Sequence, residues 1–425
     1  MAFVQDTPKA DFRLSMLIYD TRYRSLTIQV VVLGLFLLFL SWLVNNTIQN
    51  LAAKDRTFEF GFLWARAGYD INQTLISYTN DSPHYRAAMV GLLNTLLAAV
   101  IGCGLATVIG VIVGVLRLSK NWLVGRMMTV YVEMFRNVPV LLWILLAFTI
   151  LSEATPEPSA YRVTDAMIAA GEAPKASMLL NDSLAITTRS TNIPAPMVDN
   201  GLPRLEFLGL SLNSNVLAFL IVFGGSLYAN SLLRAHAKRV QEETGVRPTT
   251  WWKSLAVLVL PTAALLWWLG FHLDYPTLTR FNFKGGIEVG HSFTALTIAL
   301  ALYTAAFIAE IVRAGIMAIS RGQSEAAAAL GLRPGRTMSL VILPQALRVI
   351  IPPLISQYLN LTKNTSLAIA VSYMDLRGTL GGITLNQTGK ELECMLLMMA
   401  IYLTISLIIS SLMNMFNRAV RLKER

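Results

Sequence analysis

The chain has 425 residues, of which 54% are hydrophobic and only 14% are charged, whereas soluble domains carry roughly 25% charged residues. With a mean hydropathy of +0.54, this composition argues against a disordered tail or a soluble enzyme and predicts a membrane protein. The two cysteines, Cys103 and Cys394, do not suggest a disulfide framework. The formal charge of +10 would suggest nucleic acid in a soluble protein, but in a bilayer protein it usually reflects basic cytoplasmic loops.

Eight segments are long and apolar enough to cross roughly 30 Å of hydrocarbon, which requires about 20 residues of helix. They are predicted at 26–44, 88–116, 129–151, 213–233, 254–272, 292–312, 349–372 and 395–416. The first is too long and uninterrupted for a cleaved signal peptide, so it predicts an N-terminal membrane anchor. The sequence therefore predicts an all-α integral membrane protein.

The basic residues are distributed unequally between the two sides of the membrane. An even number of spans places both chain ends on one side, whose segments carry 21 Lys and Arg, while the longer loops opposite carry 12. The positive-inside rule then predicts that both termini are cytoplasmic. Because the charge is spread over five short segments rather than one patch, nucleic-acid binding loses its support.

Two long segments fall on the external side. Segment 152–212 is rich in Pro, Ser and Ala, carries seven acids against four bases, and predicts an exposed loop or a small cap. Segment 45–87 contains Phe58, Phe60 and Phe62 in alternation, which is typical of either a short strand or an interfacial element. Both interpretations remain open.

The residues that usually carry catalysis do not form a pattern. The four His residues are scattered, and no HExxH, GxSxG or CxxC motif occurs. A GxxxxGK[ST] phosphate loop is also missing, so this polypeptide is not expected to hydrolyse ATP by that route. We expect no catalytic residue, metal site or cofactor in this chain.

The most informative stretch lies on the predicted cytoplasmic side, between two spans. Ser320 or Ser324 can cap a helix, Glu325 is expected in its positive first turn, and an alanine run follows. Gly331 and Pro334 are expected to end it. The pattern predicts a smooth helix of about two turns, suited to a groove of another protein, with an ordinary surface helix as the alternative.

The same stretch contains a spaced motif: Glu-Ala-Ala, three residues, Gly, nine residues, Val, one residue, Leu-Pro. It resembles the EAA motif of ABC-importer permease subunits, in which Ile is usual where Val341 stands. The resemblance implies that an ATPase-coupling surface is formed by Gly322, Gln323, Glu325, Ala326, Ala327, Gly331, Leu343 and Pro344.

Further segments resemble polar amino acid permeases of the histidine and glutamine type. They are 306–316, 344–348, 363–367, Asn94-Thr95-Leu96 and Phe135-Arg136-Asn137-Val138-Pro139. The resemblance covers 88–150 and 291–416, about five spans, and implies the core of a type I ABC-importer permease plus three extra spans. The enlarged N-terminal half is similar to the glutamate/glutamine/aspartate/asparagine permease subunits of Gram-negative bacteria.

This resemblance implies a division of the chain into seven parts. They are a cytoplasmic tail at 1–25, the anchor at 26–44, a periplasmic segment at 45–87, the first part of the core at 88–151, an insertion with a periplasmic loop and two extra spans at 152–290, the second part of the core with the EAA loop at 291–416, and a basic cytoplasmic tail at 417–425.

The implied function is that of a permease subunit in an ATP-driven importer of polar or acidic L-amino acids, in the bacterial inner membrane. ATP and Mg would be used by two separate ATPase subunits. The expected partners are a second permease subunit, with a heterodimer favoured over a homodimer, a periplasmic amino acid-binding protein and the bilayer, but no nucleic acid. A secondary amino acid transporter or channel without an ATPase is the alternative.

Polar groups inside spans need a partner or a role. The candidates for the translocation path are Asn94, Thr95, Arg136, Asn360, Lys363 and Asn364. The last three share one helix face, where they either line the path or make structural contacts. Asn94 and Thr95 either bond to a neighbouring helix or line the path. Arg136 either satisfies carbonyls freed by a kink at Pro139, pairs with Glu133, or lines the path.

Two further patterns predict structural roles. Glu310 and Arg313, three residues apart near a helix end, are expected to set the orientation of the cytoplasmic helix. The small residues Gly102, Ala106, Gly110 and Gly114 predict a seam for close helix packing.

Overall fold

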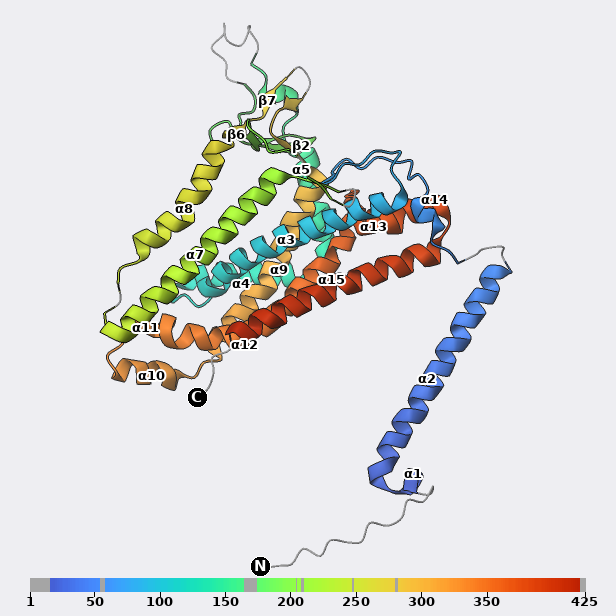
Figure 1. Cartoon of the computed structure of the whole chain (residues 1–425), viewed down its shortest axis with the longest axis horizontal. Helices are drawn as coiled ribbons and strands as arrows, with labels where there is room; N and C mark the ends of the chain where they lie inside the picture. Colours follow the sequence, from blue (N-terminus) through green and yellow to red (C-terminus); the bar gives the residue numbers. More distant parts are fainter. Residues whose placement is uncertain are drawn as a thin grey trace, which may run out of the picture. The chain divides into compact units, whose positions relative to one another are not determined.

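A computed structural model describes residues 16–53, 58–163, 174–203, 205–207, 210–246, 248–279 and 282–420, coloured along the chain in Figure 1. Parts of both predicted cytoplasmic tails, 1–15 and 421–425, lie outside the described residues. The chain forms two compact units, Met1–Phe62 and Leu63–Arg425.

The first unit contains α1 (Met16–Tyr19) and the long helix α2 (Thr21–Ala52). The apolar side chains of α2 are exposed all around it; Leu38, for example, is 68% exposed. A long helix whose apolar side chains are exposed on every side suits a lipid bilayer. The described residues 58–60 form no strand, and η1 (Gly61–Trp64) is a single 3-10 turn, so the strand interpretation of this segment is wrong.

Within the described residues, seven helices could cross a membrane, or up to eight if one bent pair counts as a span, which agrees with the eight spans predicted. Besides α2, the helices concerned are α3 (His84–Leu116), α4 (Trp122–Asn137), α5 (Val140–Glu153), α7 (Ser214–Thr244), α8 (Trp251–Trp268), α9 (His291–Met317), α12 (Leu343–Asn364) and α15 (Glu391–Val420).

Shorter helical elements join these helices. They are η2 (Pro158–Tyr161), α10 (Arg321–Ala329), α11 (Pro334–Thr337), η3 (Met338–Ile342), η4 (Thr365–Val371), α13 (Leu376–Gly378), η5 (Thr379–Thr384) and α14 (Leu385–Thr388). Two of them, η3 and η5, are π-helical turns, which occur frequently at functional sites.

The predicted third span, 129–151, is not one continuous helix. It is divided into α4 and α5, whose axes are bent by 106°. Val138, at the break, is extended (φ −108°, ψ 134°) because the ring of Pro139 disfavours a helical conformation at the preceding residue. The sequence indicated a kink here, and the structure has a complete break.

The small-residue seam of α3 packs closely against neighbouring helices, as predicted, and Gly110 and Gly114 face α9. A Cβ added at Gly110 would lie 2.7 Å from the Cβ of Ile308, and one at Gly114 would lie 2.7 Å from the backbone oxygen of Ala309. Only glycine permits the two backbones to approach this closely.

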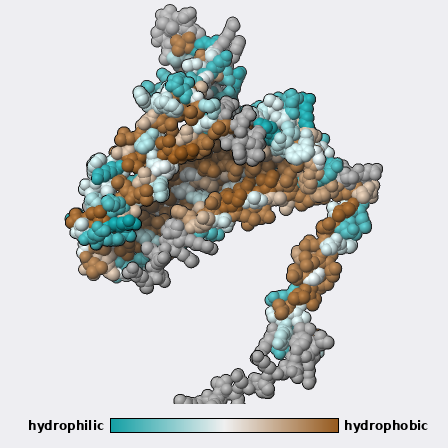
Figure 2. All heavy atoms as spheres, in the orientation of Figure 1, coloured by the Kyte–Doolittle hydropathy of each residue, from teal (hydrophilic) through white to brown (hydrophobic). Residues whose placement is uncertain are grey.

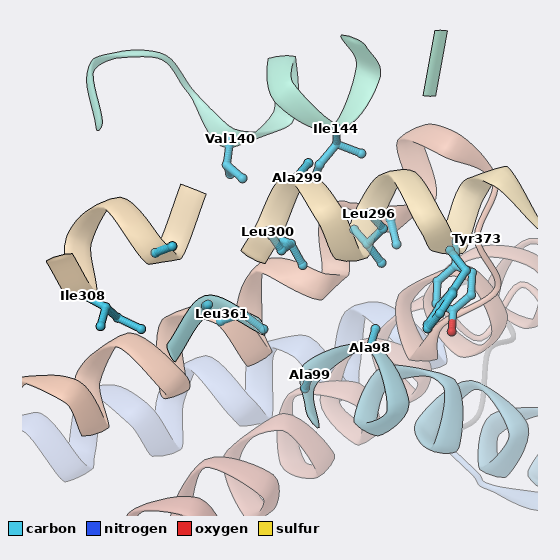
Figure 3. Close-up of a cluster of buried hydrophobic side chains, with 14 of the residues drawn as sticks. Ala98, Ala99, Val140, Ile144, Leu296, Ala299, Leu300, Ile308, Leu361 and Tyr373 are labelled. Atoms are coloured by element: carbon cyan, nitrogen blue, oxygen red, sulfur yellow. The ribbon is translucent and has the colours of Figure 1, made fainter. Parts of the chain in front are cut away.

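The main buried cluster lies around this helix pair. It joins side chains of α3, α5, α9 and α12, among them Ala98, Ile144, Leu300 and Leu361, and Figure 3 shows them converging between the helices. Because α9 is the most deeply buried of the candidate spans, it is the central helix of the unit.

The insertion contains β-strands, the first five of which lie in segment 152–212, where we predicted an exposed loop or a small cap. They are β1 (Ala185–Ile186), β2 (Ser190–Ile193), β3 (Ala195–Val198), β4 (Leu205–Phe207), β5 (Leu210–Leu212), β6 (Phe271–Asp274), β7 (Thr277–Leu278), β8 (Phe283–Lys284) and β9 (Ile287–Gly290). We call β1 to β3 together with β6 to β9 the cap. The fold is still mostly helical.

The cap joins the two ends of the insertion. β2 pairs antiparallel with β9, where Ser190 lies opposite Gly290, and β3 pairs antiparallel with β6, where Ala195 lies opposite Asp274. Helices α7 and α8 pack on each other. The chain enters α7 after β3 and passes from α8 into β6, and these two strands pair. The two extra spans are therefore a hairpin mounted on a sheet.

The surface of the second unit is divided by polarity. Figure 2 shows hydrophilic residues over the cap and a broad hydrophobic area across the helices below it. In Figure 1 the cap and helix α10 lie at opposite ends of the helical layer. This arrangement is what a bilayer requires, because only the ends of the helices meet water.

Candidate coupling surface and translocation path

The short helix predicted between two spans is α10. Ser320 is its N-cap residue, in an extended conformation and without a side-chain cap bond. Gly331 follows its end with φ +75°, and the N–H of Leu332 donates to the oxygen of Ala327 over 3.1 Å, so the predicted stop is confirmed. Glu325 is the fifth residue of the helix. The prediction that it lies in the positively charged first turn is therefore wrong.

Helix α10 is held by few contacts and is otherwise exposed. Ala327 is its one buried residue, at 4% exposure. The Nε2 of Gln345 in α12 lies 3.5 Å from the Oε1 of Gln323. The other motif residues of this helix, Gly322, Glu325 and Ala326, are exposed, so they form a small, smooth surface that another protein can contact.

The second half of the motif begins α12. Leu343 is the first residue of that helix and Pro344 the second, directly after the π-helical turn η3. Helix α10 packs against η3, the turn just before Leu343. The structure therefore brings the two halves of the motif together.

An ion cluster lies near the C-terminal end of α9. The Nη2 of Arg313 donates to the Oε1 of Glu310 over 2.9 Å, and the other carboxylate oxygen accepts from Arg117 at the end of α3. The Arg117 side chain is only 9% exposed. The pairing of Glu310 with Arg313 fits their predicted spacing, whereas Arg117 was missed because it lies 193 residues away.

Asn94 and Thr95 are fully buried in α3 and point into the protein. The Nδ2 of Asn94 donates to the backbone oxygens of Gln73 and Met374, each over 2.9 Å. The hydroxyl of Thr95 accepts the N–H of Leu376 over 3.0 Å. Both side chains therefore bond α3 to the segment that follows η4.

Arg136 is exposed at the end of α4, directly before the break. Its guanidinium carbon lies 5.5 Å from the ring centroid of Phe307 in α9, a cation–π distance. Glu133 instead accepts from the side-chain amide of Asn137 over 3.3 Å. The expected pair of Arg136 with Glu133 is not among the salt bridges of the described residues.

The last turns of α12 present a polar face. Asn360 and Lys363 are exposed and Asn364 is half-buried, while the adjacent Leu361 and Thr362 face the core. In the part of the chain that the structure describes, the Lys363 ammonium forms no salt bridge within 4 Å. The structure thus separates the six path candidates into a buried pair on α3, Arg136 on α4, and this face of α12.

Comparison with known proteins agrees with the motif. Residues 106–422 match the family described as "Binding-protein-dependent transport system inner membrane component", which covers well over half of the chain. The chain belongs to this family. It is a membrane-embedded, multi-span transport permease and not an enzyme.

Full-length relatives carry the same enlarged layout. The permease is 68% identical to the glutamate/glutamine/aspartate/asparagine transport system permease protein BztB of Rhodobacter capsulatus, over 100% of both chains. It is 41% identical to the general L-amino acid transport system permease protein AapQ of Rhizobium johnstonii, over 97% of this chain and 96% of that one. The glutamate/aspartate import permease protein GltK of Escherichia coli is 31% identical over 95% of its length but only 51% of this chain.

The permease has a buried carboxyl group just beyond η4. Asp375 is fully buried; its Oδ1 accepts the N–H of Gly378 over 2.8 Å and its Oδ2 accepts from the hydroxyl of Tyr402 over 3.3 Å. Burial raises the pKa of Asp375 to about 7, although these hydrogen bonds oppose the shift. No sequence pattern indicated this residue.

A cavity of about 490 Å³ lies between the cap and the helical core. Its lining comes from four separate parts of the chain and consists of Asn72, Gln73, Arg189, Glu288, Gly290, Ser292, Phe293, Ser372, Tyr373 and Met374. Such a site cannot be predicted from a local sequence pattern, because its lining residues are far apart in the chain.

Proposed function

We propose that this permease imports glutamate, glutamine, aspartate and asparagine, and that ATP binding to two separate ATPase subunits drives the import through α10. The observation that carries the proposal is α10 itself, an exposed alanine-rich helix anchored through Ala327 at the end opposite the cap. The substrates are those in the name of BztB, which is 68% identical over its whole length.

The packing offers a route for force from α10 to the spans. At one end α10 follows α9 after a link of three residues, and at the other it packs on η3 and bonds to Gln345 of α12. Arg117 ties α3 to Glu310 of α9. A displacement of α10 by an ATPase subunit would therefore move α3, α9 and α12 together.

The polar face of α12 is the best-supported wall of the translocation path. The Lys363 ammonium lacks a described acidic partner, so it can attract the carboxylate of an amino acid, while Asn360 and Asn364 can offer amide hydrogen bonds. Arg136 is exposed and could also face the path. Asn94 and Thr95 are better explained as positioning residues, because their bonds connect buried elements.

The assembly proposed here has further parts. A second permease subunit, more readily a relative than a copy, would complete the path, and a periplasmic binding protein would deliver substrate to the cap side. ATP and Mg would be bound by the ATPase subunits, and this chain would hold no cofactor. Both termini would be cytoplasmic, as the distribution of basic residues favours.

The test compares two charge reversals in the complete transporter. Glu325→Arg reverses a charge on α10, and Glu242→Arg makes the same change at an exposed position near the end of α7. We expect Glu325→Arg to lower ATP-driven amino acid uptake by at least about tenfold and to reduce co-purification of the ATPase, because a mismatched charge at an interface is costly. Glu242→Arg should match the unsubstituted protein.

Uptake by this chain alone in proteoliposomes would overturn the proposal and support the secondary transporter or channel. Equal uptake by the two charge-reversed variants would also contradict it, because α10 would then not transmit the work of the ATPase.

A further inference from the structure

Two exposed side chains of opposite charge line the cavity between the cap and the core. Arg189 and Glu288 both line it, and in the described portion of the chain neither side chain forms a salt bridge within 4 Å. A ligand that carries both charges can form a charge-assisted hydrogen bond with each of these side chains. The volume, about 490 Å³, lies within the roughly 300–1,000 Å³ of small-molecule pockets.

The wall of the cavity also includes the beginning of α9. Gly290, Ser292 and Phe293 line it, and Gly290 provides no side-chain cap for the helix. The first amides of a helix lack acceptors within the helix and carry partial positive charge. Together with Arg189, this helix start favours a carboxylate, whereas Glu288 favours a cation.

A strained residue forms another part of the wall. Ser372 has φ +57°, a left-handed conformation that is uncommon for residues other than glycine. Such strained residues cluster at ligand sites. Asn72 and Gln73 add amide groups and Met374 adds apolar surface.

We propose that this cavity binds a free α-amino acid, with Arg189 on the α-carboxylate and Glu288 on the α-ammonium, before the amino acid reaches the transmembrane path. The inference rests on the proposed function. A site that recognises the two charges common to all α-amino acids accepts several side chains, which suits a transporter of more than one substrate.

The first test measures equilibrium binding of radiolabelled L-glutamine to the purified, detergent-solubilised transporter without nucleotide or binding protein. Arg189→Gln and Glu288→Gln should each weaken binding by about tenfold, the usual effect of losing a charge-assisted hydrogen bond. Lys284→Gln and Glu157→Gln are the controls, because these residues lie in or beside the cap but do not line the cavity. Arg189→Lys keeps the charge and should retain most of the binding.

The second test uses ligands that lack one charge. N-acetyl-L-glutamine has no ammonium group, so it should bind the unsubstituted transporter about tenfold more weakly than glutamine does. The Glu288→Gln variant should bind the two ligands equally. L-glutamine amide lacks the α-carboxylate and should show the same pattern with Arg189→Gln. These pairings would not arise from misfolding, which lowers binding of every ligand.

Binding of glutamine that is unchanged by Arg189→Gln and Glu288→Gln, or a transporter that binds no glutamine at millimolar concentration, would overturn the inference. Uptake measured on the same preparations separates this result from the proposed function. If the unsubstituted transporter still imports amino acids, only the cavity site is lost, whereas a transporter without ATP-driven uptake contradicts the function itself.

Discussion

The interface between α3 and α9 and the polar face of α12 belong to the same helical core but are built in opposite ways. Between α3 and α9, glycines allow the backbones into contact, and a Cβ at Gly110 would lie 3.0 Å from the backbone oxygen of Ala305. On α12, Asn360 and Lys363 project out of the core without a described salt bridge. The first surface is filled by contacts within the chain, and the second is exposed.

This difference indicates where substitutions should alter folding and where they should alter transport. A buried seam has no room to relax, so added volume becomes strain. An exposed polar face contributes little to stability, so its residues are free to serve a ligand or a partner. The same contrast applies to charges: Arg117 and Arg313 both pair with Glu310, whereas Arg189 and Glu288 form no salt bridge among the described residues.

The largest effect is expected from Gly110→Leu in the seam. Its Cβ would lie 2.7 Å from the Cβ of Ile308, and the remaining carbons have no space, so we expect a loss of more than about 3 kcal/mol in the free energy of unfolding. Gly104→Leu, at a helical glycine of α3 with no atom within 4 Å of its Cβ, is the control. Size-exclusion profiles and thermal unfolding in detergent measure both. A normal melting temperature for Gly110→Leu would show that the seam is not tightly packed.

A smaller loss of stability is expected from Glu310→Gln. This change leaves the nearly buried Arg117 without its carboxylate, but Glu310 is 29% exposed, so we expect about 1–3 kcal/mol rather than the full cost of an isolated buried charge. Glu242→Gln, in the exposed pair with Lys238, should cost less than about 0.5 kcal/mol. Thermal unfolding compares the two, and equal melting temperatures would contradict a structural role for the cluster.

Lys363→Gln should leave stability nearly unchanged and lower transport. The side chain is exposed and lacks a described salt bridge, so we expect a change within about 0.5 kcal/mol, together with about a tenfold fall in the uptake of glutamate. Lys120→Gln, at an exposed residue after α3, controls for net charge. A large fall in melting temperature with uptake in proportion would instead make Lys363 a structural residue.

The buried carboxyl group of Asp375 predicts a dependence of stability on pH. The pKa of Asp375 is raised from 3.8 to about 7, so the folded protein holds a proton there that the unfolded chain loses. Its contribution to stability is fully present below pH 4 and is lost as the pH rises to about 7. The melting temperature should therefore fall between about pH 4 and pH 7, and Asp375→Asn should reduce that fall. An identical pH profile for both proteins would mean that Asp375 is ionised when folded.

Much of the architecture could be predicted from the sequence because it depends on neighbouring residues. A run of apolar residues defines a span whatever it packs against, and the alanine run with Gly331 defines α10 in the same way. The seam also followed from spacing alone, since Gly110 and Gly114 are one turn apart. The break at Pro139 was indicated only as a kink, because its angle depends on what α4 and α5 pack against.

Tertiary structure decided the features that join distant residues. Arg117 donates a hydrogen bond to Glu310, which lies 193 positions away in the sequence. The cap forms because β2 pairs with β9, although two spans lie between them in the chain. The 490 Å³ cavity requires four separate segments, and the raised pKa of Asp375 requires its burial beneath α15 residues such as Tyr402. Hydropathy and helix propensity describe each segment separately. Distances between charges, and the burial that gives them their properties, exist only after the segments have packed.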